Sequence, residues 1–95
     1  MIKHILLFKF KEGVSEKEKD KGIEMLRSLN SKISEIKEWE IGRQREINDK
    51  FYDFAQVSSF ENMEAIKCFS QNPEHRKVRT YLKARANWVK VDYDF

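Results

Sequence analysis

Residues that cross-link a chain or anchor it in a membrane are scarce in this sequence. Among its 95 residues is a single cysteine, Cys68, which excludes an intramolecular disulfide and a cysteine zinc cluster. No apolar stretch is long enough to span a membrane. The start of the sequence lacks the pattern of a signal peptide, because Lys9 and Lys11 interrupt a short apolar run and no small-residue cleavage site follows. We therefore expect a cytoplasmic protein without a membrane partner.

A strong excess of one charge is lacking too. Charged residues make up 37% of the chain, but the signs are mixed and the net charge is +3. Lysines and arginines are scattered rather than gathered with aromatics on one face, so we expect no nucleic-acid partner. Two histidines without carboxylates at ligand spacing predict no metal site, and we expect no other cofactor. The hydrophobic fraction of 40% suits the small core of one domain over residues 1–95.

Residues 2–11 show the alternation of a strand with two apolar faces. Over residues 2–11, His4, Leu6 and Phe8 point to one side, while Ile5 and Leu7 point to the other. A strand that is apolar on both sides is usually buried on both. One face of the predicted sheet can take helices, and the other needs a second layer.

The remaining elements alternate in a simple order. Ser15 and Glu18 fit a capping box that begins a helix, and residues 39–42 and 51–60 predict two strands around a turn. Helices after residue 61 and from Pro73 precede a last strand at 87–95. The order strand–helix–strand, twice, predicts an α+β ferredoxin-like βαββαβ fold with a four-stranded antiparallel sheet and helices on one face.

The helix-free face of this sheet would carry a row of apolar side chains. An exposed patch of this kind usually marks an interface. We therefore expect a homodimer formed sheet against sheet. The residues expected on this face are Ile5, Leu7, Ala55 and Val57, with Val89 and Val91 of the last strand.

One of the two histidines lies at the start of the late helix, in the segment NPEH. Asn72 is a good N-cap for a helix that begins at Pro73. His75 then shares a helix face with Val78, which packs inward. Burial and the helix N-terminus both favour a neutral imidazole, which can accept a proton as a general base. The cations Arg76, Lys77 and Arg79 are expected on other, solvated sides of this helix.

The other histidine, His4, is on the helix-facing side of the first strand. Both imidazoles can therefore line one cavity between sheet and helices, with the few polar groups and apolar walls of a small-molecule site. A pair of hydrogen-bonded structural histidines is the alternative. Gly22 leaves room above the sheet or permits close helix packing. The expected lining is His4, Leu6, Phe8, Gly22, Leu26, Phe54, Gln56, Phe69, His75, Val78 and Leu82, with Tyr52 and Trp88 as further aromatic candidates.

Three segments together resemble the stress-responsive A/B barrel (Dabb) domain: KHILLFKFK in the first strand, NPEH, and VD in the last strand. The likeness runs over nearly the whole chain and implies the ferredoxin-like dimer called a dimeric α+β barrel. Many members of this family have no assigned activity. In one plant branch, the olivetolic acid cyclases, a pocket between sheet and helices folds a linear polyketide by aldol condensation.

The resemblance implies roles for individual residues. His75 matches the catalytic histidine of the cyclases, and His4 matches their first-strand histidine. Phe69 stands where the cyclases have an assisting tyrosine, Phe54 where they have a further histidine, and Gly22 where they have an aromatic. Half of the polar constellation is thus replaced, which leaves a pocket with His75 as the base.

The sequence leaves the class of function open. The first hypothesis is a Dabb homodimer with a small-molecule ligand and acid–base chemistry at His75, with His4 as a second catalytic candidate. The second is a non-enzymatic, dimeric, stress-related binding or structural protein. A cofactor-free monooxygenase, a third class that other dimeric α+β barrels represent, has no motif to support it here.

Overall fold

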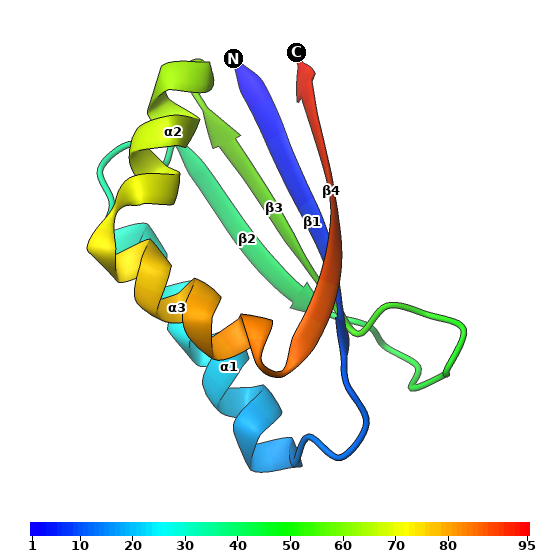
Figure 1. Ribbon diagram of the computed structural model, residues 1–95. Helices are drawn as coiled ribbons and strands as arrows, with labels where there is room; N and C mark the ends of the chain where they lie inside the picture. Colours follow the sequence, from blue (N-terminus) through cyan, green and yellow to red (C-terminus); the bar gives the residue numbers. More distant parts are fainter.

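The computed structural model describes residues 1–95 (Figure 1). Its elements are β1 (Ile2–Phe10), α1 (Glu16–Ser28), a 3-10 turn (Leu29–Ser31), β2 (Glu38–Arg43), β3 (Phe54–Phe60), α2 (Met63–Gln71), α3 (Pro73–Lys83) and β4 (Ala86–Asp94). The strands form one antiparallel sheet in the order β2-β3-β1-β4, and the three α-helices lie on one side of it (Figure 1). The predicted ferredoxin-like α+β fold is confirmed. None of the helices has the length and apolarity needed to cross a bilayer.

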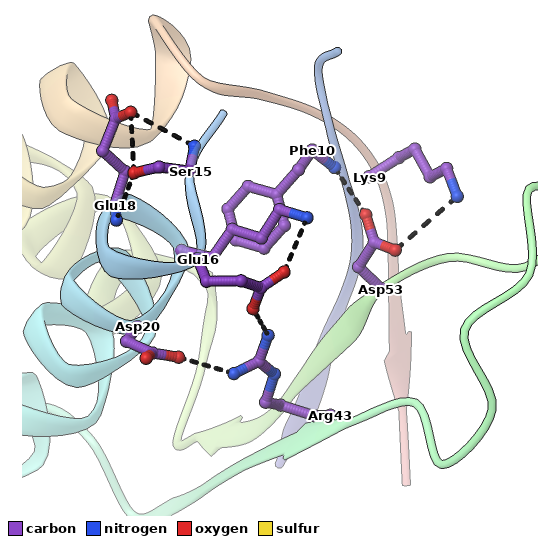
Figure 2. A network of polar contacts seen from close by, with 9 residues as sticks. Lys9, Phe10, Ser15, Glu16, Glu18, Asp20, Arg43 and Asp53 are labelled. Atoms are coloured by element: carbon purple, nitrogen blue, oxygen red, sulfur yellow. Dashed lines mark hydrogen bonds and ion pairs between the residues drawn. The ribbon is translucent and has the colours of Figure 1, made fainter. Parts of the chain in front are cut away.

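The helices begin where the sequence predicts, because side-chain caps satisfy their first N–H groups. The capping box is formed: Ser15 Oγ accepts from Glu18 N at 3.1 Å, and Glu18 Oε1 accepts from Ser15 N at 3.2 Å (Figure 2). Asn72 has two roles at the junction of α2 and α3. Its N–H donates to the carbonyl of Phe69 at the end of α2, and its Oδ1 accepts from Glu74 N at the start of α3.

The second strand of the hairpin is shorter than predicted, since β3 begins at Phe54 rather than at residue 51. The partner strand β2 ends at Arg43, opposite Phe54, and only one further hydrogen bond, Gln44 N to Asp53 O, continues the pairing. Asp53 instead caps the end of β1: its carboxylate accepts from Phe10 N at 2.7 Å and pairs with Lys9 (Figure 2). Tyr52 therefore precedes the strand and lies half exposed, away from the predicted cavity.

The core lies between the sheet and the helices. Ile23 and Leu26 of α1 are buried in it, and Leu29 of the 3-10 turn and Ile33 just after that turn continue the apolar stripe. Arg43 of β2 pairs with Asp20 at 2.7 Å and Glu16 at 3.7 Å on α1 (Figure 2). Both pairs are exposed, so they add little to stability beyond fixing the position of α1.

Gly22 allows close packing of α1 against α3. A Cβ at this position would lie 3.0 Å from Leu82 Cδ2 and 3.3 Å from Tyr81 Cε1. The alternative that Gly22 leaves room above the sheet is therefore wrong, because two side chains of α3 fill that space. Tyr81 is fixed there by a hydrogen bond from its hydroxyl to the carbonyl of Glu18 at 2.9 Å.

The helix-free face of the sheet is apolar along β3, β1 and β4. Ile5 of β1 pairs directly with Val57 and Val91, and Leu7 pairs with Ala55 and Val89, so all six side chains share this face. Leu7 is 37% exposed, Val89 49% and Val91 51%. Exposing these three apolar side chains to water costs free energy, and burial in an interface would remove that cost.

Candidate functional site

A cavity of about 340 Å³ lies between the sheet and the helices. Its volume is at the lower end of the range for small-molecule sites, roughly 300–1,000 Å³. The apolar lining consists of Leu6, Phe8, Leu26, Ile66, Phe69, Val78, Leu82 and Trp88. The polar lining consists of His4, Gln56, Ser70, His75, Arg79 and Lys90. The walls are thus mostly apolar, with a few polar groups that can orient a ligand.

The sheet contributes the floor through its alternation. His4, Leu6 and Phe8 of β1 point towards the helices, and they lie opposite Asp92, Lys90 and Trp88 of β4 in the register. Gln56 of β3 lies opposite Leu6 on the other side. Side chains of directly paired residues share a face, so these three strands present one continuous surface to the cavity.

Asp92 fixes the orientation of His4. The Nδ1 of His4 is 2.5 Å from Asp92 Oδ1, and both side chains are largely buried. An ionised carboxylate only accepts hydrogen bonds, so Nδ1 carries the proton and Nε2 is the other ring nitrogen available for interaction. No residue of the chain bonds to Nε2, and no fully buried side-chain polar atom lacks a partner. Nε2 is therefore accessible to a molecule in the cavity.

His75 is held in the same manner from the helix side. Its Nδ1 is 3.3 Å from the carbonyl oxygen of Ser70, which can only accept, so Nδ1–H donates and Nε2 keeps its lone pair. Burial lowers the pKa of His75 below its ordinary value of 6.5; the Ser70 carbonyl opposes this shift, while the charges of Arg79 and His4 add to it. The lowered pKa favours the neutral imidazole near pH 7, in which Nε2 can accept a proton.

Phe69 lies between the two histidines. Its ring centroid is 4.3 Å from that of His75 and 6.1 Å from that of His4. The two imidazoles reach the cavity from opposite layers without a hydrogen bond between them. At the position where the resemblance implies a tyrosine hydroxyl, there is only an apolar ring. Any polar contact to His75 Nε2 must therefore come from a ligand or from water.

The structure brings most of the predicted lining together. His4, Leu6, Phe8, Leu26, Gln56, Phe69, His75, Val78, Leu82 and Trp88 all contribute to the cavity wall. Three predicted residues do not: Tyr52 precedes β3 and lies away from the cavity, Gly22 lies beneath Tyr81 and Leu82, and Phe54 is stacked on Phe8 at 4.4 Å between ring centroids. Phe54 was wrongly assigned to the lining because alternation predicts which face of the sheet a side chain lies on, but not whether it reaches the cavity.

Sequence reasoning missed three charged residues at the site. Arg79 was placed on a solvated side of its helix; it is exposed, but it also lines the cavity. Its spacing of four from His75 puts both on one helix face, and this signal was available. Asp92 belongs to the VD segment that the resemblance singles out, but its contact with His4, like the place of Lys90 at the cavity, follows from the register between β1 and β4. No group of three or more His, Cys, Asp or Glu side chains is arranged to hold a metal ion.

This sheet, with its helices on one face and an apolar row on the other, defines the class of ferredoxin-like α+β proteins. Residues 2–95 match the family model of the Stress responsive A/B Barrel Domain, Dabb, and the chain belongs to this family. It is 32% identical over 97 residues to an uncharacterized protein of Streptomyces coelicolor, with both chains covered completely.

Two solved structures place the fold among known proteins. A dimeric protein of unknown function and ferredoxin-like fold from Bacteroides fragilis is 30% identical, with a TM-score of 0.85 and coverage of 99% of this chain and 95% of that one. A hydroxynitrile lyase from Passiflora edulis is 22% identical, with a TM-score of 0.81 and coverage of 97% and 90%. At that identity the second likeness concerns the fold alone.

Proposed function

We propose that this Dabb protein binds a small molecule in the cavity between sheet and helices and that His75 acts there as an acid–base group. The supporting observation is the state of His75, whose Nδ1–H is bound to the Ser70 carbonyl while Nε2 is unprotonated. His4, oriented by Asp92, offers a second ring nitrogen from the opposite wall. The hydroxynitrile lyase from Passiflora edulis indicates that this fold is compatible with enzymatic activity.

The reaction best suited to this arrangement is proton transfer at an acidic C–H or O–H group of a bound molecule. Nε2 of His75 takes the proton, and the imidazolium that forms can return it to the same or another atom. The apolar walls keep water away from the anion that is left behind. In this scheme Asp92 is a positioning residue, because it acts on the ligand only through His4.

The test is hydrogen–deuterium exchange of carbon acids in D₂O, measured by proton NMR with phenylacetone and related ketones as probes. We expect wild-type protein to exchange the protons next to the carbonyl faster than buffer does. His75→Gln should lose this exchange, while Arg76→Gln, on the exposed side of the same helix, should keep it. Equal exchange by wild type and His75→Gln would contradict a role as base.

A non-enzymatic binding protein is the second candidate, and Phe69 favours it. This ring contacts His75 but has no hydroxyl with which to assist a proton transfer. Under this alternative, ligands shift the NMR resonances of Trp88 and His75 equally well in wild type and in Phe69→Tyr, and neither protein exchanges carbon-bound protons. Faster exchange by Phe69→Tyr than by wild type would instead support acid–base chemistry.

The homodimer is part of the same proposal. Of the six apolar side chains of the helix-free face, defined above, Leu7, Val89 and Val91 are exposed and the other three are partly buried. A second copy of the same face is the simplest cover, and the Bacteroides fragilis protein is described as dimeric. The cavity is on the opposite side of the sheet, so two copies would carry two separate sites. A cytoplasmic location stays a prediction.

A further inference from the structure

The cavity is lined by cations and by no carboxylate, so a charged ligand should be an anion. We propose that the cavity takes a small organic anion with an apolar body, whose carboxylate binds between Arg79 of α3 and Lys90 of β4. The inference rests on the small-molecule site proposed above and adds the chemical class of its occupant. Asp and Glu, which make up 16 of the 95 residues, are absent from the lining, whereas Arg79, Lys90 and the two histidines are present.

Arg79 has no partner within the chain. The one acidic residue of its helix, Glu74, pairs instead with Lys32 at 3.8 Å and with Lys77 at 3.7 Å. Arg79 lies one turn beyond His75 on the same face of α3, and its charge acts on that imidazole. A guanidinium with five free donors therefore stands at the rim of an apolar cavity.

Lys90 lines the same cavity from the sheet, but its charge is partly matched. Its Nζ is 3.5 Å from Asp92 Oδ2, while Oδ1 of the same carboxylate holds His4. Asp92 thus balances one of the two cations, and Arg79 supplies the excess positive charge. One unmatched guanidinium suits one carboxylate, to which it can donate two parallel hydrogen bonds.

The apolar lining decides between an organic acid and an inorganic oxyanion. Eight of the 14 lining residues are hydrophobic, and Trp88 and Phe8 give the floor aromatic surface. Phosphate would leave these walls wet and would gain nothing from them. An acid with an aromatic or branched body fills the cavity while its carboxylate stays at the exposed rim, where the cost of desolvating a charge is least.

The experiment compares acids with their uncharged amides in binding to the full chain. Phenylacetate and octanoate are titrated against phenylacetamide and octanamide, with inorganic phosphate as a third arm, by ¹H–¹⁵N NMR of the labelled protein at low salt. We expect the acids to bind about tenfold more tightly than the amides, as for one charge-assisted contact. Arg79→Gln should abolish the preference, because acid binding falls to the level of amide binding. Arg76→Gln, the matched control on the outer side of α3, should keep it.

The outcomes separate this inference from the proposed function. Equal binding of acids and amides to wild type would overturn the anion site while leaving the small-molecule cavity intact. Loss of the preference in both arginine variants would also overturn it, since general attraction by a basic surface would then suffice. Tighter binding of phosphate than of the organic acids would assign the cations to an inorganic ion. Failure of acids and amides alike to bind would overturn the ligand site itself.

Discussion

His4 and Asp92 lie directly opposite each other on β1 and β4, and their side chains join as an imidazole–carboxylate pair on the helix-facing side of the sheet. The pair links the first strand of the chain to the last. Because β4 is at the edge of the sheet, this contact ties an edge strand to the interior strand β1 beside the cavity.

Removing the carboxylate should destabilise the fold. Asp92→Ala leaves the buried Nδ1–H of His4 without an acceptor, and we expect a loss of about 1–3 kcal/mol in the free energy of unfolding. Urea denaturation measures it. Asp94→Ala, two residues further along the same strand and exposed, is the control and should change stability by much less. Equal shifts of the two urea midpoints would show that the pair adds nothing.

The protonation of His75 should make stability depend on pH. Its pKa in the folded protein is below the ordinary value of 6.5, chiefly through burial, while in the unfolded chain it is close to that value. The unfolded state therefore binds the proton first as the pH falls. Stability contributed by the neutral ring is complete above pH 6.5 and is lost as the pH falls towards the lowered pKa.

The predicted loss of stability at low pH is checked by urea denaturation at pH 7.5 and pH 5, comparing wild type with His75→Gln. We expect wild type to lose more stability than the variant between the two pH values. The other charged or titratable groups that act on the ring, Arg79 and His4, are present in both proteins. An identical pH dependence in the two proteins would mean that His75 is as accessible to protons in the folded chain as in the unfolded one.

Enlarging Gly22 should disturb the contact between α1 and α3. Gly22→Leu forces a branched side chain against Tyr81 and Leu82, and we expect a loss of about 1–3 kcal/mol from overpacking. Thermal unfolding followed by circular dichroism measures the effect. Gly42 has no atom within 4 Å of a built Cβ, so Gly42→Leu is the matched control and should be tolerated. A variant at Gly22 as stable as wild type would mean that the helices separate freely.

A charge on the helix-free face should weaken the proposed dimer. Burying a leucine is worth roughly 1.5–3 kcal/mol, so Leu7→Lys removes a large apolar contribution and adds a charge to desolvate. Light scattering should show the mass of a dimer for wild type and a shift towards monomer for the variant. Ile47→Lys, at a loop position that is 97% exposed, should leave the mass unchanged. Wild type that is monomeric at micromolar concentration would contradict the dimer.

Local patterns predicted the elements and much of the candidate site. Alternation placed His4, Leu6 and Phe8 on the helix-facing side, and the N-cap at Asn72 placed His75 on its helix. The errors arose where contacts between distant segments decide. Residues 51–53 have strand composition but almost no partner, because β2 ends at Arg43. Asp92 depends on a register that pairs the two ends of the chain, which no short window of sequence contains.

The junction at Asn72 has a consequence for the chemistry of the cavity. This one residue ends α2 and begins α3, and its two hydrogen bonds tie the end of one helix to the start of the next. The carbonyl of Ser70, just before this joint, selects the tautomer of His75, just after it. Bending the joint would release that carbonyl and let the imidazole proton move from one ring nitrogen to the other. The junction between the two helices thus also favours Nε2 as the nitrogen that can act as the base.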